Sequence, residues 1–270
     1  LQKHKSKKDK MRSIAFINQK GGVGKTTSTA NVGACLAALG KKVLLIDLDP
    51  QANMSIHFGI NVQGKGLSIY EVMCDKKTVS EVLTKTTVRG LDIIPSDIDL
   101  ASAEVELVSV VGRETIVKFH LEDILGEYDY VLIDCPPSLG LLTLNALTVA
   151  NEIFIPLQTE FFALQGVSKL IQTFDVIKKR LNSSLEITGI IVCMYDSRTK
   201  LGQAVLDKIK EYFADKVFVT NIRKNIKLSE ATSHGVPITV YAPESNGAQD
   251  YEALTKEIVA QETKHPKEMV

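Results

Sequence analysis

The sequence predicts an α/β fold: a doubly wound, mostly parallel sheet with helices on both faces. Short apolar, β-branched runs alternate with longer segments of helical periodicity through most of the 270-residue chain. Several of the short runs are apolar almost throughout, as strands buried on both faces should be. A glycine-rich segment, INQKGGVGKTTS at 17–28, separates the first such run from the first helical segment. Together these features predict a sheet with a ligand-binding loop after its first strand.

Seven runs combine high β propensity with flanking turn residues and are expected to be strands. They are 12–18, 42–48, 91–96, 128–135, 152–157, 186–194 and 216–220. Helices are expected at 25–39, with Gly40 as a stop signal, and at 97–111, 113–125, 140–150, 162–181, 200–213 and 249–262. Because strand and helix alternate, the strands should run parallel and bind ligands at their carboxyl ends.

Composition favours one large globular domain, expected over 12–262. A basic flexible tail is expected at 1–11, as a solvated segment or as an arm that contacts phosphates, and a frayed C-terminus at 263–270. The 32 basic and 32 acidic residues argue against binding nucleic acid through bulk charge and leave a local basic patch possible. No apolar run reaches the roughly 18 residues that span a bilayer, so we expect a cytoplasmic protein. The four cysteines have no metal-ligand spacing and are expected to be reduced and buried.

The glycine-rich segment resembles a phosphate-binding loop with one substitution. The pattern G-x-x-x-x-G-K-[ST] requires a glycine five residues before Gly24, where this chain has Gln19 followed by Lys20. The backbone of Gly21, Gly22, Val23 and Gly24 can still approach phosphate oxygens closely, between a buried strand and a helix. The loop therefore predicts nucleotide binding.

The residues after the glycines have separate expected tasks in that site. Lys25 would reach the β and γ phosphates, and Thr26 would place its hydroxyl on Mg²⁺. Thr27 could donate to the α phosphate at the start of the helix. These roles predict a bound nucleoside triphosphate with magnesium.

Three acids lie at or just beyond the ends of predicted strands. Asp47 and Asp49 in VLLIDLDPQ are two residues apart and would share one side of a continuing extended run, and Asp134 ends YDYVLIDC as a Walker B aspartate does. Each could instead cap a helix or a turn. Beside a phosphate loop, the three together favour metal and water chemistry.

Five segments carry a resemblance to a known family. The chain resembles the deviant Walker A branch of the P-loop NTPases, and within it the ParA/Soj chromosome and plasmid partition ATPases, over about residues 12–260. The segments are KGGVGKTT, LLIDLDPQ, LIDCPPSLG, YDSRTKLG at 195–202 and KLSEATSHGVPI at 227–238. The resemblance implies ATP and Mg²⁺ as cofactors and an ATP-dependent homodimer.

In that family the additional lysine, here Lys20, crosses to the nucleotide of the partner subunit. The resemblance further implies that Lys20, Lys25 and Asp49 are catalytic, with Asp49 orienting the attacking water. Asp47 and Asp134 would support magnesium together with Thr26. Unaided hydrolysis should be slow, because the loop supplies no arginine finger, and a ParB-type centromere-binding protein should stimulate it.

The adenine end of the site is expected at Asn225, in a segment where Arg223 replaces the family proline. A second family proline is replaced by Thr232. Nonspecific DNA binding is expected at basic residues of two loops, with an ordinary charged surface as the alternative interpretation. These residues are Arg198, Lys200, Lys224 and Lys227. A nucleoid-associated location would follow.

Three other functions have sequence requirements of their own. A MinD-like membrane-associated ATPase would need an amphipathic C-terminal anchor, and TKHPKEMV offers no apolar face. An iron-sulfur carrier would need paired cysteines, and Cys135 has no evident companion in the sequence. A noncatalytic ATP-binding scaffold would lack a water-orienting acid, whereas Asp49 is present. Phe161 and Phe162 could pack on the core or on the dimer face.

Overall fold

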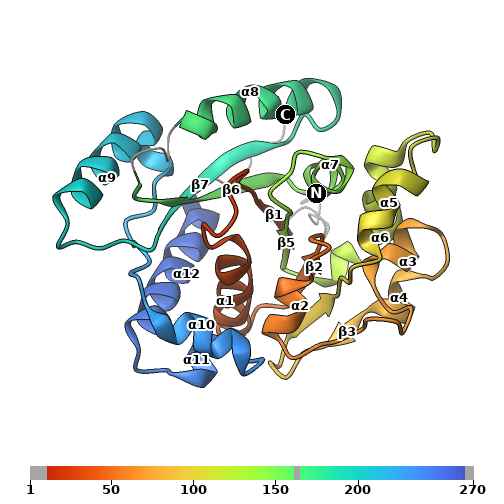
Figure 1. Ribbon diagram of the computed structural model, residues 1–270, viewed down its shortest axis with the longest axis horizontal. Coiled ribbons are helices and arrows are strands. Elements are labelled where there is room, and N and C mark those ends of the chain that lie inside the picture. The colour runs from red at the N-terminus through yellow and green to blue at the C-terminus, as the bar shows by residue number, and fades with distance from the viewer. Residues whose placement is uncertain (1–10, 161–164, 265–270) are drawn as a thin grey trace, which may run out of the picture.

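The computed structural model describes residues 11–160 and 165–264. Within these residues the chain forms a seven-stranded sheet in the order β3-β4-β2-β5-β1-β6-β7 (Figure 1). Its strands are β1 Arg12–Phe16, β2 Val43–Asp47, β3 Thr84–Lys85, β4 Leu91–Ile94, β5 Tyr130–Asp134, β6 Glu152–Gln158 and β7 Glu186–Cys193. The short β3 pairs antiparallel with β4, and the other pairs are parallel. The predicted doubly wound, mostly parallel fold is thus confirmed. The basic tail at 1–10, Phe161 and Phe162, and residues 265–270 lie outside the described residues.

Alternate residues of the central strands enter two separate hydrophobic cores. Ile14 and Phe16 of β1 belong to one core, and Ala15, between them, belongs to the other. This alternation follows from the two-residue period of a strand. It explains why the strands read as continuous apolar runs, since neither face of the sheet is left to water.

One core packs under five helices, which include the helix that follows the glycine-rich loop. These are α1 Lys25–Ala38, α2 Asn53–His57, α10 Ile226–Ser233, α11 Ile238–Tyr241 and α12 Asn246–Lys264. In Figure 1, α1 and α12 lie side by side on this face. The other core packs under α3 Ile69–Met73, α4 Val79–Val82, α5 Leu100–Glu106, α6 Ile116–Leu121, α7 Leu141–Val149, α8 Gln165–Arg180 and α9 Lys200–Phe213. Among the described residues, none of the helices is both long and apolar enough to cross a membrane.

The predicted strand at 216–220 is wrong. Its segment forms only an isolated bridge to β7, from Val217 to Ile190. The carboxylate of Glu257, on α12, accepts the backbone N–H groups of Val219 and Thr220, each at 2.8 Å. These amides therefore cannot join the ladder of the sheet. Farther along, the Ile222 N–H donates to the Val192 carbonyl at 2.8 Å, so the chain still covers the outer edge of β7.

The helix predicted at 97–111 is shorter in the structure, where α5 ends at Glu106. Beyond it, Val108 and Val111 are 61% and 99% exposed and give no buried stripe to extend the helix. The helix predicted at 113–125 is a short 3₁₀ turn, Arg113–Thr115, followed by α6.

Candidate nucleotide-binding site

The predicted phosphate loop joins β1 to α1 at the carboxyl end of the sheet. Gly22 and Gly24 have φ angles of +71° and +95°, which side chains with a Cβ rarely adopt. A Cβ on Gly24 would also lie 3.4 Å from the Cys193 sulfur, so the loop packs closely on β7. Val23 is buried and anchors the loop, whereas Gln19 is exposed. The missing consensus glycine thus falls where the backbone has room for a side chain.

Lys20 lies on the outer rim of this loop. Its side chain is 49% exposed, and its ammonium lies 2.5 Å from Glu160 Oε2 and 3.3 Å from Gln158 Oε1. The Gln158 amide also donates to the Gly22 carbonyl at 2.8 Å. No sequence motif marks Gln158 or Glu160. The one available signal is their place at the carboxyl end of β6, which lies beside β1 in the sheet, with Gln158 as its last residue and Glu160 just beyond it.

Lys25 has the opposite environment. Its side chain is buried, with 7% of the residue exposed, and its ammonium lies 3.3 Å from the Lys20 carbonyl, inside the curve of the loop. The loop therefore presents one buried and one exposed ammonium.

Two of the predicted acids meet at the ends of neighbouring strands. Asp47 of β2 and Asp134 of β5 are register partners, and both are fully buried. The Thr26 hydroxyl donates to Asp134 Oδ2 at 2.6 Å. Burial raises the pKa of Asp134 well above the usual carboxyl range, and the charge of Asp47 raises it further, while the Thr26 hydrogen bond lowers it. Asp134 Oδ1 has no hydrogen-bond partner among the described residues.

Ser55 holds Asp47 in place. Its backbone N–H and its hydroxyl both donate to Asp47 Oδ2, at 2.9 and 2.7 Å. Burial raises the pKa of Asp47 to about 6, although these hydrogen bonds lower it. Because β2 ends at Asp47, the extended run expected to include Asp49 does not continue as a strand. Asp49 instead donates its N–H to Asp47 Oδ1 at 3.2 Å and accepts the Gln51 N–H at 3.0 Å.

These residues fit a magnesium ion that is shared with phosphates. A buried carboxylate oxygen without a partner and an adjacent threonine hydroxyl are oxygen ligands of the kind that Mg²⁺ prefers. Throughout 11–160 and 165–264 no group of three or more His, Cys, Asp or Glu side chains could hold a metal by itself. A site with few protein ligands is typical of Mg²⁺, which usually binds one or two carboxylates together with substrate phosphates.

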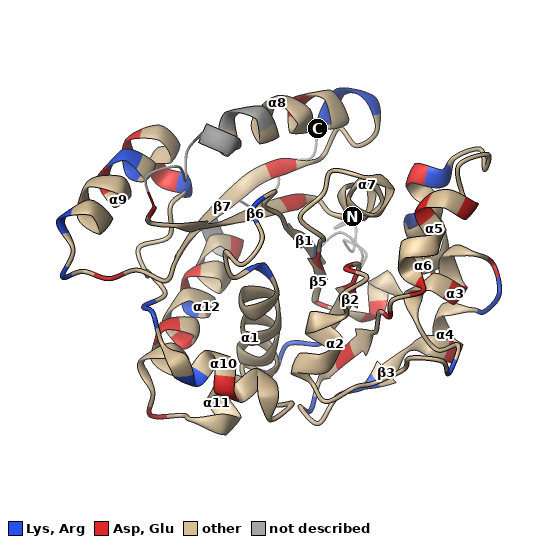
Figure 2. Ribbon diagram, in the orientation of Figure 1, with Lys and Arg blue, Asp and Glu red and all other residues tan. Residues whose placement is uncertain are grey.

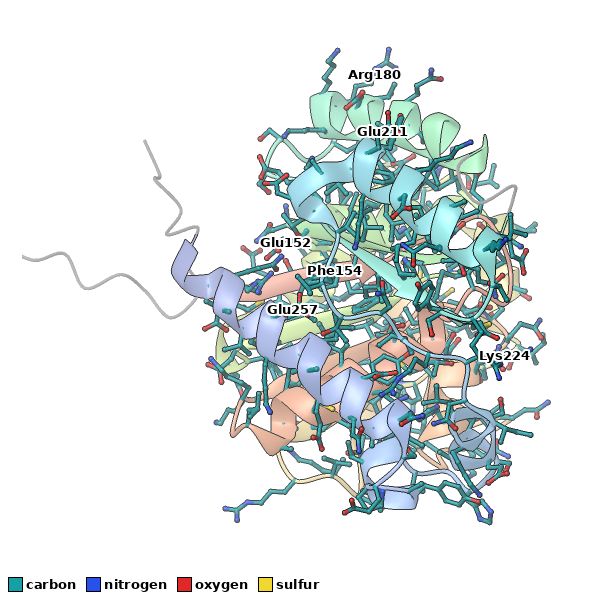
Figure 3. The ribbon with its side chains drawn as sticks, turned by 90° about the vertical axis from the view of Figure 1, so that its left-hand side faces the viewer. Glu152, Phe154, Arg180, Glu211, Lys224 and Glu257 are labelled. Atoms are coloured by element: carbon teal, nitrogen blue, oxygen red, sulfur yellow. The ribbon has the colours of Figure 1, made fainter. Side chains whose placement is uncertain are left out.

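The structure brings the two basic loops together. The Tyr195 N–H donates to the Ile222 carbonyl at 2.9 Å, and Tyr195 bridges to Arg223. In Figure 2 the basic positions of these loops lie on one side of the molecule, and Figure 3 shows Lys224 at its edge. The sequence alone could not establish this proximity.

Acids partly neutralise this basic surface. Arg198, Arg223 and Lys227 pair with Asp196, Asp250 and Glu230 respectively, at 2.7, 2.6 and 2.8 Å. The hydrogen bonds from Arg198 lower the pKa of Asp196 to about 2, so this acid stays charged at neutral pH. Lys200 begins α9 and is exposed, as is Lys224. A polyanion would have to compete with three internal ion pairs.

Asn225, expected at the adenine end, caps α10. Its side-chain oxygen accepts the Lys227 N–H at 2.9 Å. The segment before it runs beside the end of β7, where Cys193 contacts Gly24 of the loop. The geometry thus places Asn225 on the same edge of the sheet as the phosphate loop.

A parallel sheet with this loop after its first strand and acids at adjacent strand ends defines a P-loop nucleotide-binding protein. A model of the AAA domain family matches residues 11–187. The chain is 51% identical to the chromosome-partitioning ATPase Soj of Treponema pallidum over 251 residues, which are 93% of this chain and 98% of that protein. It is 49% identical to the sporulation initiation inhibitor protein Soj of Bacillus subtilis over 247 residues, 92% of this chain and 98% of that one.

A solved structure of similar fold is cobyrinic acid a,c-diamide synthase from Mycobacterium smegmatis, with bound ADP and magnesium. It is 34% identical, covers 95% of this chain and 97% of its own, and superposes with a TM-score of 0.83. The chain belongs to the AAA domain family and, within it, to the Soj/ParA chromosome-partitioning ATPases.

Proposed function

We propose that the chain is a Mg²⁺-dependent partition ATPase that forms a homodimer when it binds ATP. The ATP-bound dimer binds DNA without sequence preference, and hydrolysis stimulated by a ParB-type protein releases it. One observation carries most of this proposal: the loop has two lysines, of which Lys25 is buried within it and Lys20 faces outward. An outward ammonium can serve a phosphate on a second subunit better than one on its own.

Each residue of the site has a task in this mechanism. The loop amides and Lys25 would bind the β and γ phosphates, and Thr26 and Asp134 would hold Mg²⁺. The ion would offset charge that develops on the phosphate oxygens. Asp49, 7% exposed and fixed by its contacts with Asp47 and Gln51, would orient the attacking water.

Lys20 has to leave Glu160 before it can reach a partner. Both side chains are about half exposed, and such ion pairs contribute roughly 0.2–1 kcal/mol, so the exchange is readily reversible. A triphosphate carries more charge than one carboxylate and would outcompete Glu160. Occupancy by ATP would in this way control dimer formation.

Dimerisation is tested by light scattering with ATP and Mg²⁺ on a slow-hydrolysis background. Asp49→Ala should form dimers, and Asp49→Ala/Lys20→Ala should remain monomeric while still binding ATP. The matched control is Asp49→Ala/Lys256→Ala, which should dimerise. Lys256 is also an exposed lysine, but it lies on α12 near Ile258, whose carbonyl accepts a hydrogen bond from Arg12 at the start of β1, whereas the phosphate loop follows the other end of that strand. A double variant that dimerises as Asp49→Ala does would refute the role of Lys20 in the partner site.

DNA binding is tested by cosedimentation of Asp49→Ala and ATP with random duplex DNA or with anionic liposomes. We expect the protein to cosediment with DNA and not with liposomes. A MinD-like membrane ATPase would instead cosediment with liposomes and not with DNA. Lys200→Ala and Lys224→Ala should each reduce the salt dependence, by about 0.9 in the logarithmic slope for each phosphate that the variant no longer neutralises. An unchanged slope in both variants would remove the basic loops from the DNA interface.

We expect a cytoplasmic, nucleoid-associated protein, because the basic loops would hold the ATP-bound dimer on DNA. Imaging a fluorescent fusion in cells tests this, and the Lys200→Ala/Lys224→Ala variant should spread away from the nucleoid.

A further inference from the structure

The short helix α2 is attached to the nucleotide-binding acids at one end. It begins at Asn53, directly after the turn that contains Asp49, and its N-cap Ala52 has a φ of +52°. Within α2, Ser55 donates twice to Asp47, and its hydroxyl accepts the Ser96 N–H at 3.0 Å. A shift of the acids at the strand ends would therefore move α2.

At its other end α2 is hydrogen-bonded to α10. His57, the last residue of α2, is 1% exposed, and its Nδ1 lies 2.9 Å from the Thr232 hydroxyl oxygen. That hydroxyl also lies 3.2 Å from the Leu228 carbonyl, to which it can only donate. Because Thr232 has a single proton to give, His57 must donate from Nδ1 for both hydrogen bonds to exist.

The contact is buried and closely packed. His57 Nε2 is buried and has no hydrogen-bond partner in the described part of the chain. Beside it, a Cβ on Gly235 would lie 2.9 Å from the Gly59 Cα, so the loops that follow the two helices touch through backbone alone. Buried contacts of this kind tend to have discrete arrangements and transmit displacement rather than absorb it.

α10 begins beside two of the residues that are expected to bind ligands. Asn225 is its N-cap, and Lys227 lies in its first turn. The hydrogen bonds of Ser55 with Asp47 and of His57 with Thr232, joined by the backbone of α2, thus connect the acids to the helix that begins after Asn225.

We propose that His57 and Thr232 are positioning residues that couple the nucleotide site to α10. When ATP replaces ADP, the backbone amides of α10 change in their protection from solvent. Thr232 stands where the corresponding segment of the family that the sequence resembles has proline, which has no hydroxyl and could not form this hydrogen bond. The inference rests on the proposed nucleotide site and does not depend on the proposed DNA binding.

The test is amide hydrogen exchange of α10 in the full chain, with Mg²⁺ and either ADP or adenylyl imidodiphosphate. In the wild type, exchange of α10 should differ between the two nucleotides. In Thr232→Val, which keeps the shape and loses the hydroxyl, the ratio of the two exchange rates should fall about three- to tenfold, the factor that one buried hydrogen bond typically contributes. Affinity for both nucleotides, measured separately, should remain within about twofold.

Two controls separate coupling from stability. Thr255→Val removes a buried hydroxyl that donates to the Tyr251 carbonyl four residues earlier on α12, and it should leave the exchange ratio unchanged. Thr232→Ser retains the hydroxyl and should restore the ratio. An undiminished ratio in Thr232→Val, or a wild type that binds both nucleotides with no difference in α10, would overturn the coupling. Failure of the protein to cosediment with DNA would refute only the proposed DNA interface, because exchange in α10 is measured without DNA.

Discussion

Replacing Asp134 by Asn should stabilise the protein without ligands. The carboxylate is fully buried, the Thr26 hydroxyl satisfies one oxygen, and the other has no hydrogen-bond partner among the described residues. An asparagine oxygen can still accept from Thr26, and the buried charge beside Asp47 disappears. A buried unsatisfied charged group costs more than the roughly 1–3 kcal/mol of a neutral one, and the substitution exchanges the former for the latter, because the new NH₂ group takes the place of the unpartnered oxygen. We expect a net gain of about 1–2 kcal/mol.

The companion variant Asp47→Asn should bring no such gain, although Asp47 is equally buried. Both of its oxygens accept backbone N–H groups, from Asp49 and Ser55. An asparagine NH₂ group in either position would oppose a donor, which offsets the benefit of removing the charge.

The assay is thermal unfolding at pH 7.5 with EDTA and no nucleotide. A gain of 1–2 kcal/mol raises Tm by about 2–8 °C in a chain of this size. When Mg²⁺ and ADP are added, the wild type should gain further stability by linkage, and Asp134→Asn should lose the part that depends on Mg²⁺. If Asp134→Asn melts at or below the wild-type temperature in EDTA, the carboxylate is not a strained group held for a cation.

Three further predictions concern stability. Arg12→Met removes the guanidinium from an ion pair with Glu152, in which the two side chains are 12% and 10% exposed. It should lower the free energy of unfolding, measured in urea, by about 3–5 kcal/mol, and a loss below 1 kcal/mol would contradict this. Gly235→Ala should destabilise more than Gly40→Ala, because both have positive φ but only Gly235 lies against backbone, and equal losses would show that the contact yields. Burial lowers the pKa of His57 to about 4, so as pH falls below 6.5 the unfolded chain takes up a proton before the folded chain does. The free energy of unfolding of the wild type, relative to that of His57→Gln, should therefore drop by about 2 kcal/mol from pH 7.5 to pH 5. A constant difference would show that His57 is not held neutral.

The sequence predicts best what local chemistry determines. The phosphate loop and the positions of Asp47 and Asp134 at strand ends are readable because each lies next to a strongly apolar run. The predicted helix at 200–213 has the same bounds as the 14-residue α9, since its apolar stripe is long enough to show helical periodicity.

Other features depend on contacts between distant segments. The run at 216–220 has high β propensity, yet Glu257, some forty residues later, takes its amides out of the sheet. The short helices α2, α3, α4, α10 and α11 have four to eight residues each, too few for a periodic pattern to stand out. Ser55 gains its relevance from Asp47 on β2, and Gln158 and Glu160 from Lys20 in the phosphate loop, so no local pattern marks them.

The two margins of the sheet bear on how copies of this chain can meet. On one side the last strand is two residues long and runs opposite to its neighbour, with Lys85 paired to Asp92. On the other, the Phe218 and Ile222 amides bind carbonyls of β7, which shields that strand. Within the described part of the chain, neither margin offers a long row of unsatisfied amides to an incoming strand, so association by sheet extension, a common route to aggregation, is disfavoured. A protein that gathers on DNA and is later released, as proposed for this chain, would benefit from that protection.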